Sequence, residues 1–409
     1  MRTVDEHLAG ILGRVGPLTP LTRPLEQVSG CVLAEDVVST GAVPSFANSS
    51  MDGYALRAAD VAAATEGSPV VLPVAGEIAA GSSTLHALAP GQAFRIMTGA
   101  PLPVGADAVV AQERTDLGVA RVAVSHAPAV GEYVREPGSD VQAGSTVVRA
   151  GTVLGPRTVA LLAATGHARV LVHPRPRVVV VSTGSELRDP GTPLARGQIN
   201  DSNSYMLAAA VTAAGGVAYR VGPVDDDPRT LTEVLSDQLV RADALVTSGG
   251  VSVGAYDVVR DVLARIGDVE FGPVAMQPGM PQGFGTIGED AVPVFALPGN
   301  PVSSYVSFEV FVRPALRSMR GFAAVQRPVA TGRWAHPHRS PAGKRQYLRV
   351  VLSGRARDGK PLVSAAGGPS SHLLGGLAGA SALAVVPADV IAAKAGDEVQ
   401  ITVLDDVES

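Results

Sequence analysis

Three loops rich in glycine and small hydroxyl side chains carry the residue types that bind phosphate. Each follows an apolar run typical of a buried strand, and they span residues 182–187, 247–254 and 298–304. Glycines let successive backbone N–H groups converge and hydroxyls add further donors, so such a loop forms an anion nest beside a helix N-terminus. One such loop often only turns the chain, but three at one sheet edge favour a ligand that carries phosphate.

Acidic residues stand beside these loops, where they would repel a phosphate unless a cation lay between them. They are Glu186, Asp201, Asp225, Asp226, Asp227 and Asp257. Mg²⁺ bound by carboxylate and phosphate oxygens is the usual solution. The alternative is helix capping, since Asp227 precedes Pro228 at a predicted helix start and Asp201 fits an N-cap position. Capping is favoured for Asp201, and metal or ligand binding for Glu186 and Asp257.

The motifs of common nucleotide enzymes do not occur in the sequence. It has no Walker A lysine motif and no G-x-G-x-x-G, which argues against an ordinary nucleotide kinase or dinucleotide dehydrogenase. A serine nucleophile elbow is also absent. Ser185 and Ser303 are therefore interpreted as phosphate donors or helix caps, and not as nucleophiles.

The elements that position these loops alternate between strand and helix from about residue 176 to residue 325. The continuous β-branched run at 177–181 is typical of a strand buried on both faces of a parallel sheet. Further strands are predicted at 218–221, 245–246 and 292–297, and helices at 202–214, 230–241, 258–266 and 303–319. This alternation predicts a doubly wound α/β domain, in which ligands bind beyond the carboxyl ends of the strands.

The rest of the chain is rich in short β-type runs and turns. Of 409 residues, 46 are glycine and 31 proline, while 46% are hydrophobic, so the chain can build several cores joined by many turns. A helix is predicted over 1–15, and residues 18–175 are typical of all-β modules with one helix at 157–165. The tail from about 325 predicts a small β-barrel. The length suggests two to four domains.

Charge and cysteine content exclude several classes of protein. The net charge is −5, from 33 basic and 38 acidic side chains without long blocks, so no basic surface for nucleic acid or an anionic membrane is expected. Cys31 is the single cysteine, which excludes an intrachain disulfide and a cysteine-based metal cluster. The first residues lack the apolar core of a signal peptide, and no stretch is apolar enough to span a bilayer. A cytoplasmic protein without nucleic-acid or membrane partners is expected.

Two further segments, at 44–55 and 95–110, would by composition alone be hairpins and loops. Together with the three loops they form an ordered set of motifs. The set is Asn48-Ser49-Ser50-Met51-Asp52-Gly53-Tyr54-Ala55, Arg95 to Pro103 with Gly105 to Val110, Ser182 to Leu187, Ser248 to Gly254, and Leu297 to Ser303. By these motifs the chain resembles the molybdopterin molybdenumtransferase family, which includes the gephyrin E domain, over essentially its whole length.

The resemblance implies a multidomain α/β plus β fold and an elongated homodimer. Four domains are expected, namely an N-terminal mixed module at 1–43 with 143–175, a β-rich inserted domain at 44–142, a doubly wound α/β molybdopterin-binding domain at 176–325, and a C-terminal β-barrel at 326–409. The implied reaction takes adenylylated molybdopterin and molybdate as substrates and releases AMP, with Mg²⁺ as cofactor. Its site is expected where the α/β domain of one subunit faces the β-rich insert of the other.

The same resemblance assigns site residues. The catalytic acids are Asp52 from the β-rich insert and Glu186, Asp226 and Asp257 from the α/β domain, and the last three are also the expected metal ligands. Substrate-binding residues are expected on the loops of three domains. They are Thr98, Gly99, Asp140, Thr183, Gly184, Ser185, Ser248, Gly249, Gly250, Ser252, Pro298, Gly299, Asn300, Pro301, Ser303, Arg349 and Ser371.

One motif departs from the family pattern. Many relatives read Lys-Pro-Gly-Lys-Pro where this chain has Gln277-Pro278-Gly279-Met280-Pro281. Two cations that would meet molybdate or phosphate are thus an amide and a thioether. Backbone N–H groups could still hold the anion, and the cations that could substitute are Arg313, Arg345 and Arg349.

Two alternatives differ from metal insertion. The first is adenylyl transfer from ATP to molybdopterin, which a similar α/β domain performs; the β-rich regions and Asp52 favour metal insertion over it. The second is a non-catalytic dimeric scaffold like the gephyrin E domain, which the retained acids disfavour. Transient contacts with the molybdopterin adenylylating enzyme and with cofactor-receiving enzymes are the expected partnerships.

Overall fold

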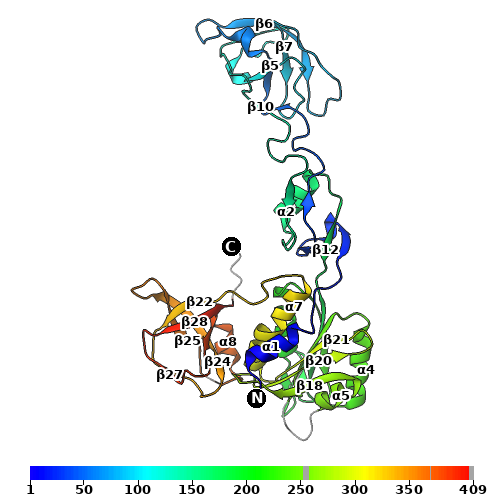
Figure 1. The fold of residues 1–409 in the computed structure, drawn as a ribbon, viewed down its shortest axis with the longest axis vertical. Helices are drawn as coiled ribbons and strands as arrows, with labels where there is room; N and C mark the ends of the chain where they lie inside the picture. The colour runs from blue at the N-terminus through cyan, green and yellow to red at the C-terminus, as the bar shows by residue number, and fades with distance from the viewer. Residues whose placement is uncertain (252–257, 369, 405–409) are drawn as a thin grey trace. The chain divides into compact units, whose positions relative to one another are not determined.

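The chain forms two compact units in a computed structural model (Figure 1), which describes residues 1–251, 258–368 and 370–404. The first unit comprises Met1–Leu21, Gly30–Ala34 and Leu171–Ser409, and the second comprises Thr22–Ser29 and Glu35–Val170. The β-rich insert and most of the expected N-terminal module fall within one unit by this division. The four domain boundaries given above stay predictions.

A six-stranded sheet forms the centre of the first unit. Its order is β16-β13-β17-β21-β20-β18. Strands β16, β13, β17 and β21 pair in parallel, and β20 pairs antiparallel with both β21 and β18. The bounds are β13 Arg177–Thr183, β16 Val217–Val224, β17 Ala244–Ser248, β18 Gly267–Pro273, β20 Pro281–Ile287 and β21 Val292–Leu297. The doubly wound α/β prediction is confirmed, and the structure adds two strands that were not predicted, β20, which runs antiparallel to its neighbours, and β18.

Helices cover both faces of this sheet because consecutive strand residues point to opposite sides. Val178 and Val180 pack in a core with α1 (Val4–Leu12), α3 (Asn203–Ala213), α6 (Pro301–Ser307) and α7 (Arg313–Met319). Val179 and Val181 pack in a second core with α4 (Pro228–Leu239) and α5 (Val258–Ile266). The predicted helix at 303–319 is therefore α6 and α7, joined by a π-helical segment over Phe308–Val312.

The predicted C-terminal β-barrel is confirmed. Strands β24, β25, β22, β28 and β26 pair in this order, and β26 pairs back to β24, which closes the barrel. Their bounds are β22 Ala330–Trp334, β24 Arg345–Arg355, β25 Pro361–Ala365, β26 Ala382–Val386 and β28 Glu398–Val403. A short strand, β19 (Met276–Gln277), joins β24 in parallel and so connects the α/β domain to the barrel.

The second unit is β-rich and contains one α-helix in the part of the chain that the structure describes, α2 (Pro156–Ala164). Its largest sheet has the order β8-β5-β7-β6-β9. The bounds are β5 Gly53–Leu56, β6 Val70–Ile78, β7 Ala93–Ile96, β8 Ala108–Ala111 and β9 Arg121–Val124. Gly53 is the first residue of β5, and a Cβ there would lie 2.0 Å from the Val110 carbonyl oxygen of β8. The residue after Asp52 must therefore be glycine.

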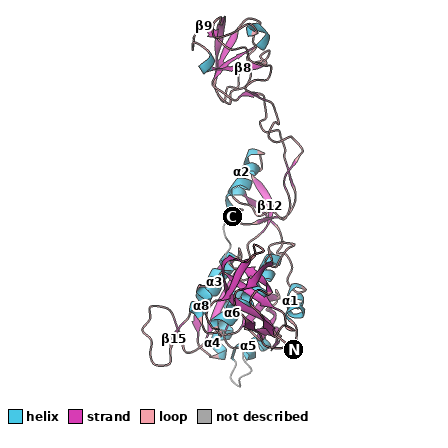
Figure 2. Cartoon of the chain, turned by 90° about the vertical axis from the view of Figure 1, so that its left-hand side faces the viewer, coloured by secondary structure: helices cyan, strands magenta, loops and turns pink. Residues whose placement is uncertain are grey.

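A loop leaves the α/β domain between two short parallel strands, β14 (Leu187–Arg188) and β15 (Ile199–Asn200), and extends away from the domain (Figure 2). In the described residues, no helix combines the length and the apolar character that crossing a membrane requires.

Candidate functional site

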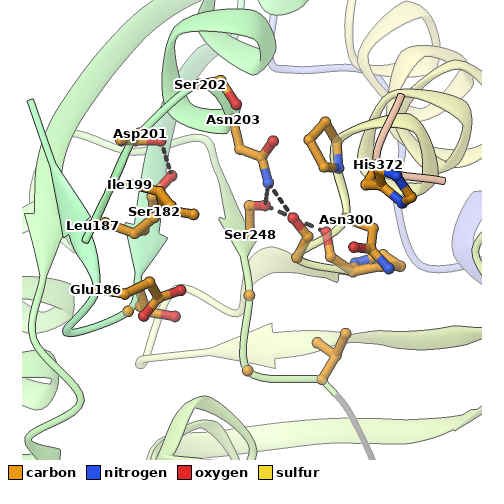
Figure 3. Close-up of a pocket in the computed structure, with 18 of the residues that line it drawn as sticks. Ser182, Glu186, Leu187, Ile199, Asp201, Ser202, Asn203, Ser248, Asn300 and His372 are labelled. Atoms are coloured by element: carbon orange, nitrogen blue, oxygen red, sulfur yellow. Dashed lines mark hydrogen bonds between the residues drawn. The ribbon is translucent and has the colours of Figure 1, made fainter. Parts of the chain in front are cut away.

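A cavity of about 900 Å³ lies beyond the carboxyl ends of β13, β17 and β21 (Figure 3). All three glycine-rich loops line it, as the α/β topology predicts. Eleven of the expected site residues contribute to its wall: Thr183, Gly184, Glu186, Asp226, Ser248, Gly249, Gly250, Pro298, Gly299, Asn300 and Pro301.

The remaining expected residues lie elsewhere. Ser185, Ser303, Arg349 and Ser371 belong to the same unit but do not line the cavity, and Asp52, Thr98, Gly99 and Asp140 belong to the second unit. Ser252 and Asp257 lie outside the described residues. Asn203 and His372 also line the cavity and were not predicted as site residues, and Asp201, for which capping was favoured over ligand binding, lines it as well.

The first loop places a carboxylate over a glycine. Gly184 has a φ of +155°, and a Cβ on it would lie 2.6 Å from a carboxylate oxygen of Glu186. Glu186 is exposed and can fold back over this position only because glycine occupies it. Ser185 and Asp226 exchange two hydrogen bonds of 3.2 Å: the Ser185 N–H donates to the Asp226 carboxylate, and the Asp226 N–H donates to the Ser185 hydroxyl. The acids on the loops after β13 and β16 thus face one cavity.

The second and third loops lie in contact with each other. Gly249 and Gly250 have φ values of +99° and +67°, a conformation that favours glycine. A Cβ on Gly249 would lie 2.7 Å from the Thr183 carbonyl oxygen, and a Cβ on Gly299 would lie 3.5 Å from the Gly249 Cα. At Gly249 the first and second loops therefore approach more closely than a side chain would allow, and the third loop lies in contact with the second. This arrangement suits an anionic ligand held by main-chain N–H groups.

Asp201 stands one residue before Ser202, the N-cap residue of α3, and its side chain makes the capping bond that was favoured from the sequence. Its side chain is 1% exposed, and its Oδ1 accepts from the Ser204 N–H at 3.1 Å and from the Ser182 hydroxyl at 3.0 Å. Oδ2 accepts from the Ser204 hydroxyl at 2.5 Å. Asp201 thereby joins the first turn of α3 to the end of β13. Asp227 is likewise the N-cap of α4, accepting from the Thr230 N–H at 2.8 Å.

Replacing Asp201 by alanine should destabilise the protein by about 2 kcal/mol, because it leaves two buried serine hydroxyls and a helix N–H without their acceptor. Urea unfolding measures the change. The matched control is Asp237→Ala on the exposed surface of α4, expected to stay within about 0.5 kcal/mol of the parent. Equal stability of the two variants would contradict the bonding role of Asp201.

Arg349 holds a loop of the barrel. Its side chain is 2% exposed and donates to the carbonyl oxygens of Leu373 at 2.6 Å, Ser370 at 3.2 Å and Gly368. Burial lowers the pKa of its guanidinium. The same loop brings His372 to the cavity, and its Ser371 carbonyl accepts from the Val302 N–H in the first turn of α6 at 3.0 Å. Direct substrate binding by Arg349 and Ser371 stays a prediction.

The other candidate substitutes for the missing lysines face carboxylates. Arg345 binds Asp5 with two hydrogen bonds of 2.7 Å, which raise the pKa of the guanidinium. Arg313 lies 4.0 Å from the carboxylate of Glu309. Gln277 accepts from the side-chain amide of Gln346 at 3.4 Å, and Met280 is 40% exposed. Arg313 and Arg345 are therefore less suited than a free lysine to meet an oxyanion.

The second unit presents Asp52 at the start of β5. Its Oδ1 accepts from the backbone N–H of Thr98 at 2.7 Å and from the Thr98 hydroxyl at 2.8 Å. Both bonds lower the pKa of the Asp52 carboxyl, which is exposed and so stays ionised. Gly99 follows with a φ of +80°. Asp140 is exposed, and the described structure shows no hydrogen bond between it and Asp52.

Replacing Thr98 by valine should raise the pKa of Asp52, since the hydroxyl bond that favours the carboxylate is lost while the N–H bond remains. A depressed pKa keeps the carboxylate ionised down to lower pH, so its loss should move the acid limb of any rate that needs this charge to higher pH. A carboxyl-carbon NMR titration of Asp52 measures the pKa directly. An unchanged titration midpoint would show that the hydroxyl does not hold the carboxylate.

In the described parts of the chain, no three His, Cys, Asp or Glu side chains gather closely enough to hold a metal ion. Glu186 and Asp226 supply two carboxylates at the cavity. This donor set fits Mg²⁺, which is commonly bound through one or two carboxylates together with substrate phosphates and water.

Comparison with known proteins shows which family the chain resembles. Three family models match: the MoeA N-terminal region (domain I and II) over residues 2–166, a probable molybdopterin binding domain over 179–318, and the MoeA C-terminal region (domain IV) over 331–404. Together they leave only short connecting segments and the chain ends unmatched.

Relatives match over nearly the full length. Molybdopterin molybdenumtransferase 2 of Mycobacterium tuberculosis is 46% identical over 98% of this chain and 99% of its own, and molybdopterin molybdenumtransferase 1 of that organism is 43% identical over 99% of both. A crystal structure of a molybdopterin biosynthesis MoeA protein from Pyrococcus horikoshii superposes with a TM-score of 0.75 at 28% identity, covering 99% of this chain and 100% of its own.

Proposed function

Because the chain belongs to the molybdopterin molybdenumtransferase family, it is a transferase of molybdenum cofactor biosynthesis, and we propose that its chemistry takes place in the cavity at the sheet edge. There, molybdate is joined to adenylylated molybdopterin and AMP is released. The observation that supports this site is the convergence of three glycine-rich loops with Glu186 and Asp226. Backbone N–H groups bind the phosphates, and the carboxylates bind the cation that phosphates require.

Mg²⁺ would be held by Glu186 and Asp226, with Asp257 as the expected third acid. When bound, the ion polarises the phosphoanhydride and neutralises the charge of the leaving AMP. The chain's own residues bind and orient: the loops fix the two phosphates, and the cavity keeps the dithiolene near molybdate. Placing two anions side by side is mainly a positioning task, so no covalent nucleophile is required.

The experiment is to mix purified protein with adenylylated molybdopterin, Mg²⁺ and molybdate, and to follow AMP release. We expect release that depends on molybdate. Release without molybdate, or none at all, would refute metal insertion. Consumption of ATP with pyrophosphate release would instead indicate adenylyl transfer, and the relatives' names do not favour that alternative or a non-catalytic scaffold.

We further propose a homodimer in which Asp52 of one subunit completes the cavity of the other. Thr98 holds the Asp52 carboxylate with two hydrogen bonds, and the positive charge of Arg95 also lowers the pKa of Asp52. The carboxylate nevertheless stays exposed, which supports a role toward a ligand. A cytoplasmic location and transient contacts with the adenylylating enzyme and with cofactor-receiving enzymes complete the proposal.

Co-expressing Asp52→Asn and Glu186→Gln subunits should restore activity if the site is shared. A mixed dimer then has one site with both substitutions and one intact site. With random pairing half of the dimers are mixed, so about a quarter of the wild-type rate is expected. Each variant alone is the control. Recovery no better than the sum of the two single variants would show that each site lies within one chain.

A further inference from the structure

The start of α3, with the residues just before it, contacts the ends of the three strands whose loops line the cavity. Asp201 binds Ser182 at the end of β13, as described above. Asn203 binds the other two: its Nδ2 donates to the Ser248 hydroxyl at the end of β17, at 2.8 Å, and to the Gly299 carbonyl after β21, at 2.7 Å. Figure 3 shows both bonds leaving the same amide nitrogen.

The orientation of this amide is fixed by chemistry. The Gly299 carbonyl can only accept a hydrogen bond, so the atom that faces it must be the nitrogen. Both amide hydrogens are then used. The Asn203 Oδ1 is buried and has no hydrogen-bond partner among the described residues. An unpaired buried carbonyl oxygen lowers the free energy of unfolding, so a contribution to stability does not explain why an amide side chain stands here.

The two loops that Asn203 joins are the two that touch. A Cβ on Gly299 would come within 3.5 Å of the Gly249 Cα, and the Gly249 N–H donates to the Leu297 carbonyl at 3.1 Å, so the backbones of these two loops run close together. Adenylylated molybdopterin carries two phosphates linked directly to each other, whereas AMP carries one. Two neighbouring loops can each bind one of two linked phosphates only when the distance between the loops is fixed.

We propose that Asn203 is a positioning residue that sets the spacing of the loops at 248–250 and 298–300, so that they bind two linked phosphates together. The inference rests on the proposed function only for the identity of the ligand. Its consequence is selective: loss of the amide weakens a ligand that spans both loops and spares one that occupies a single loop.

The test compares two ligands on the intact protein without molybdate, so that no turnover occurs. Binding of adenylylated molybdopterin and of AMP is measured by titration calorimetry in the presence of Mg²⁺. For Asn203→Ala, we expect the affinity for adenylylated molybdopterin to fall about tenfold, as for two lost hydrogen bonds, with AMP affinity within about twofold. Ser248→Ala, which removes one of the two acceptors, should show a smaller loss.

Thr212→Ala is the matched control, since it removes an exposed hydroxyl at the other end of α3 and should alter neither affinity. Equal losses for both ligands with Asn203→Ala would show a general collapse of the cavity and overturn the proposal. Unchanged affinity for adenylylated molybdopterin would overturn it as well. Wild-type protein that binds this ligand but releases no AMP with molybdate would refute the proposed function while leaving the spacing role supported.

Discussion

Replacing Asp52 by asparagine should lower the rate of molybdate-dependent AMP release by a factor of about 10²–10³. Asparagine keeps the size of the side chain, and its Oδ1 can still accept from the Thr98 N–H and hydroxyl that hold Asp52 now. Only the negative charge is lost. The expected effect is therefore on turnover, with little change in the fold of the second unit.

Initial rates of AMP release measure the loss of turnover, and analytical ultracentrifugation tests whether the variant keeps the shape and assembly of the wild-type protein. The matched control is Asp116→Asn in the same unit, because Asp116 is also exposed and its Oδ1 also accepts two hydrogen bonds, here from the backbone N–H groups of Gly118 and Ala123. It should retain the wild-type rate. An Asp52→Asn rate equal to that of this control would remove Asp52 from the site.

Local sequence patterns were sufficient to predict the three loops. Each combines a β-branched or apolar run with glycines and small hydroxyls, and the strand–helix alternation around them fixes their common edge through the handedness of α/β folds. The capping role of Asp201 was also within reach, because it depends on neighbours only three residues away along the helix.

Other parts of the site depend on contacts that the sequence does not encode locally. Asn203 joins residues 45 and 96 positions away, and nothing in its neighbourhood distinguishes it from an ordinary residue in the first turn of a helix. Arg349 could be predicted as a functional cation from the sequence. Its hydrogen bonds to the carbonyl oxygens of Ser370 and Leu373 could not, because these residues are brought beside it only by the folding of the barrel. The antiparallel strand β20 was missed because its glycines at 283 and 285, required by close packing against β18, weaken the strand signal.

The Gln277 and Met280 replacements have a related consequence. Arg345 is paired to Asp5 and Arg313 lies near Glu309, and among the described residues that line the cavity there is no lysine or arginine. Anion binding then depends more on main-chain N–H groups and on the metal ion that Glu186 and Asp226 would hold. Loss of either acid should therefore be felt more strongly here than in a site that retains two lysines.

On this reasoning, Glu186→Gln should reduce AMP release by a factor of about 10²–10³ at a fixed Mg²⁺ concentration, and should raise the Mg²⁺ concentration needed for half-maximal rate. Removing Mg²⁺ with a chelator should abolish release by the wild-type protein. Gly184→Ala should also lower the rate and raise the Mg²⁺ requirement, because the new Cβ would lie 2.6 Å from the Glu186 carboxylate and displace it. Glu289→Gln, on an exposed turn of the same domain, is the control for loss of a negative charge. If Glu186→Gln and Glu289→Gln need the same Mg²⁺ concentration for half-maximal rate, then losing the carboxylate at the cavity matters no more than losing one at the surface. That result would exclude Glu186 as a metal ligand.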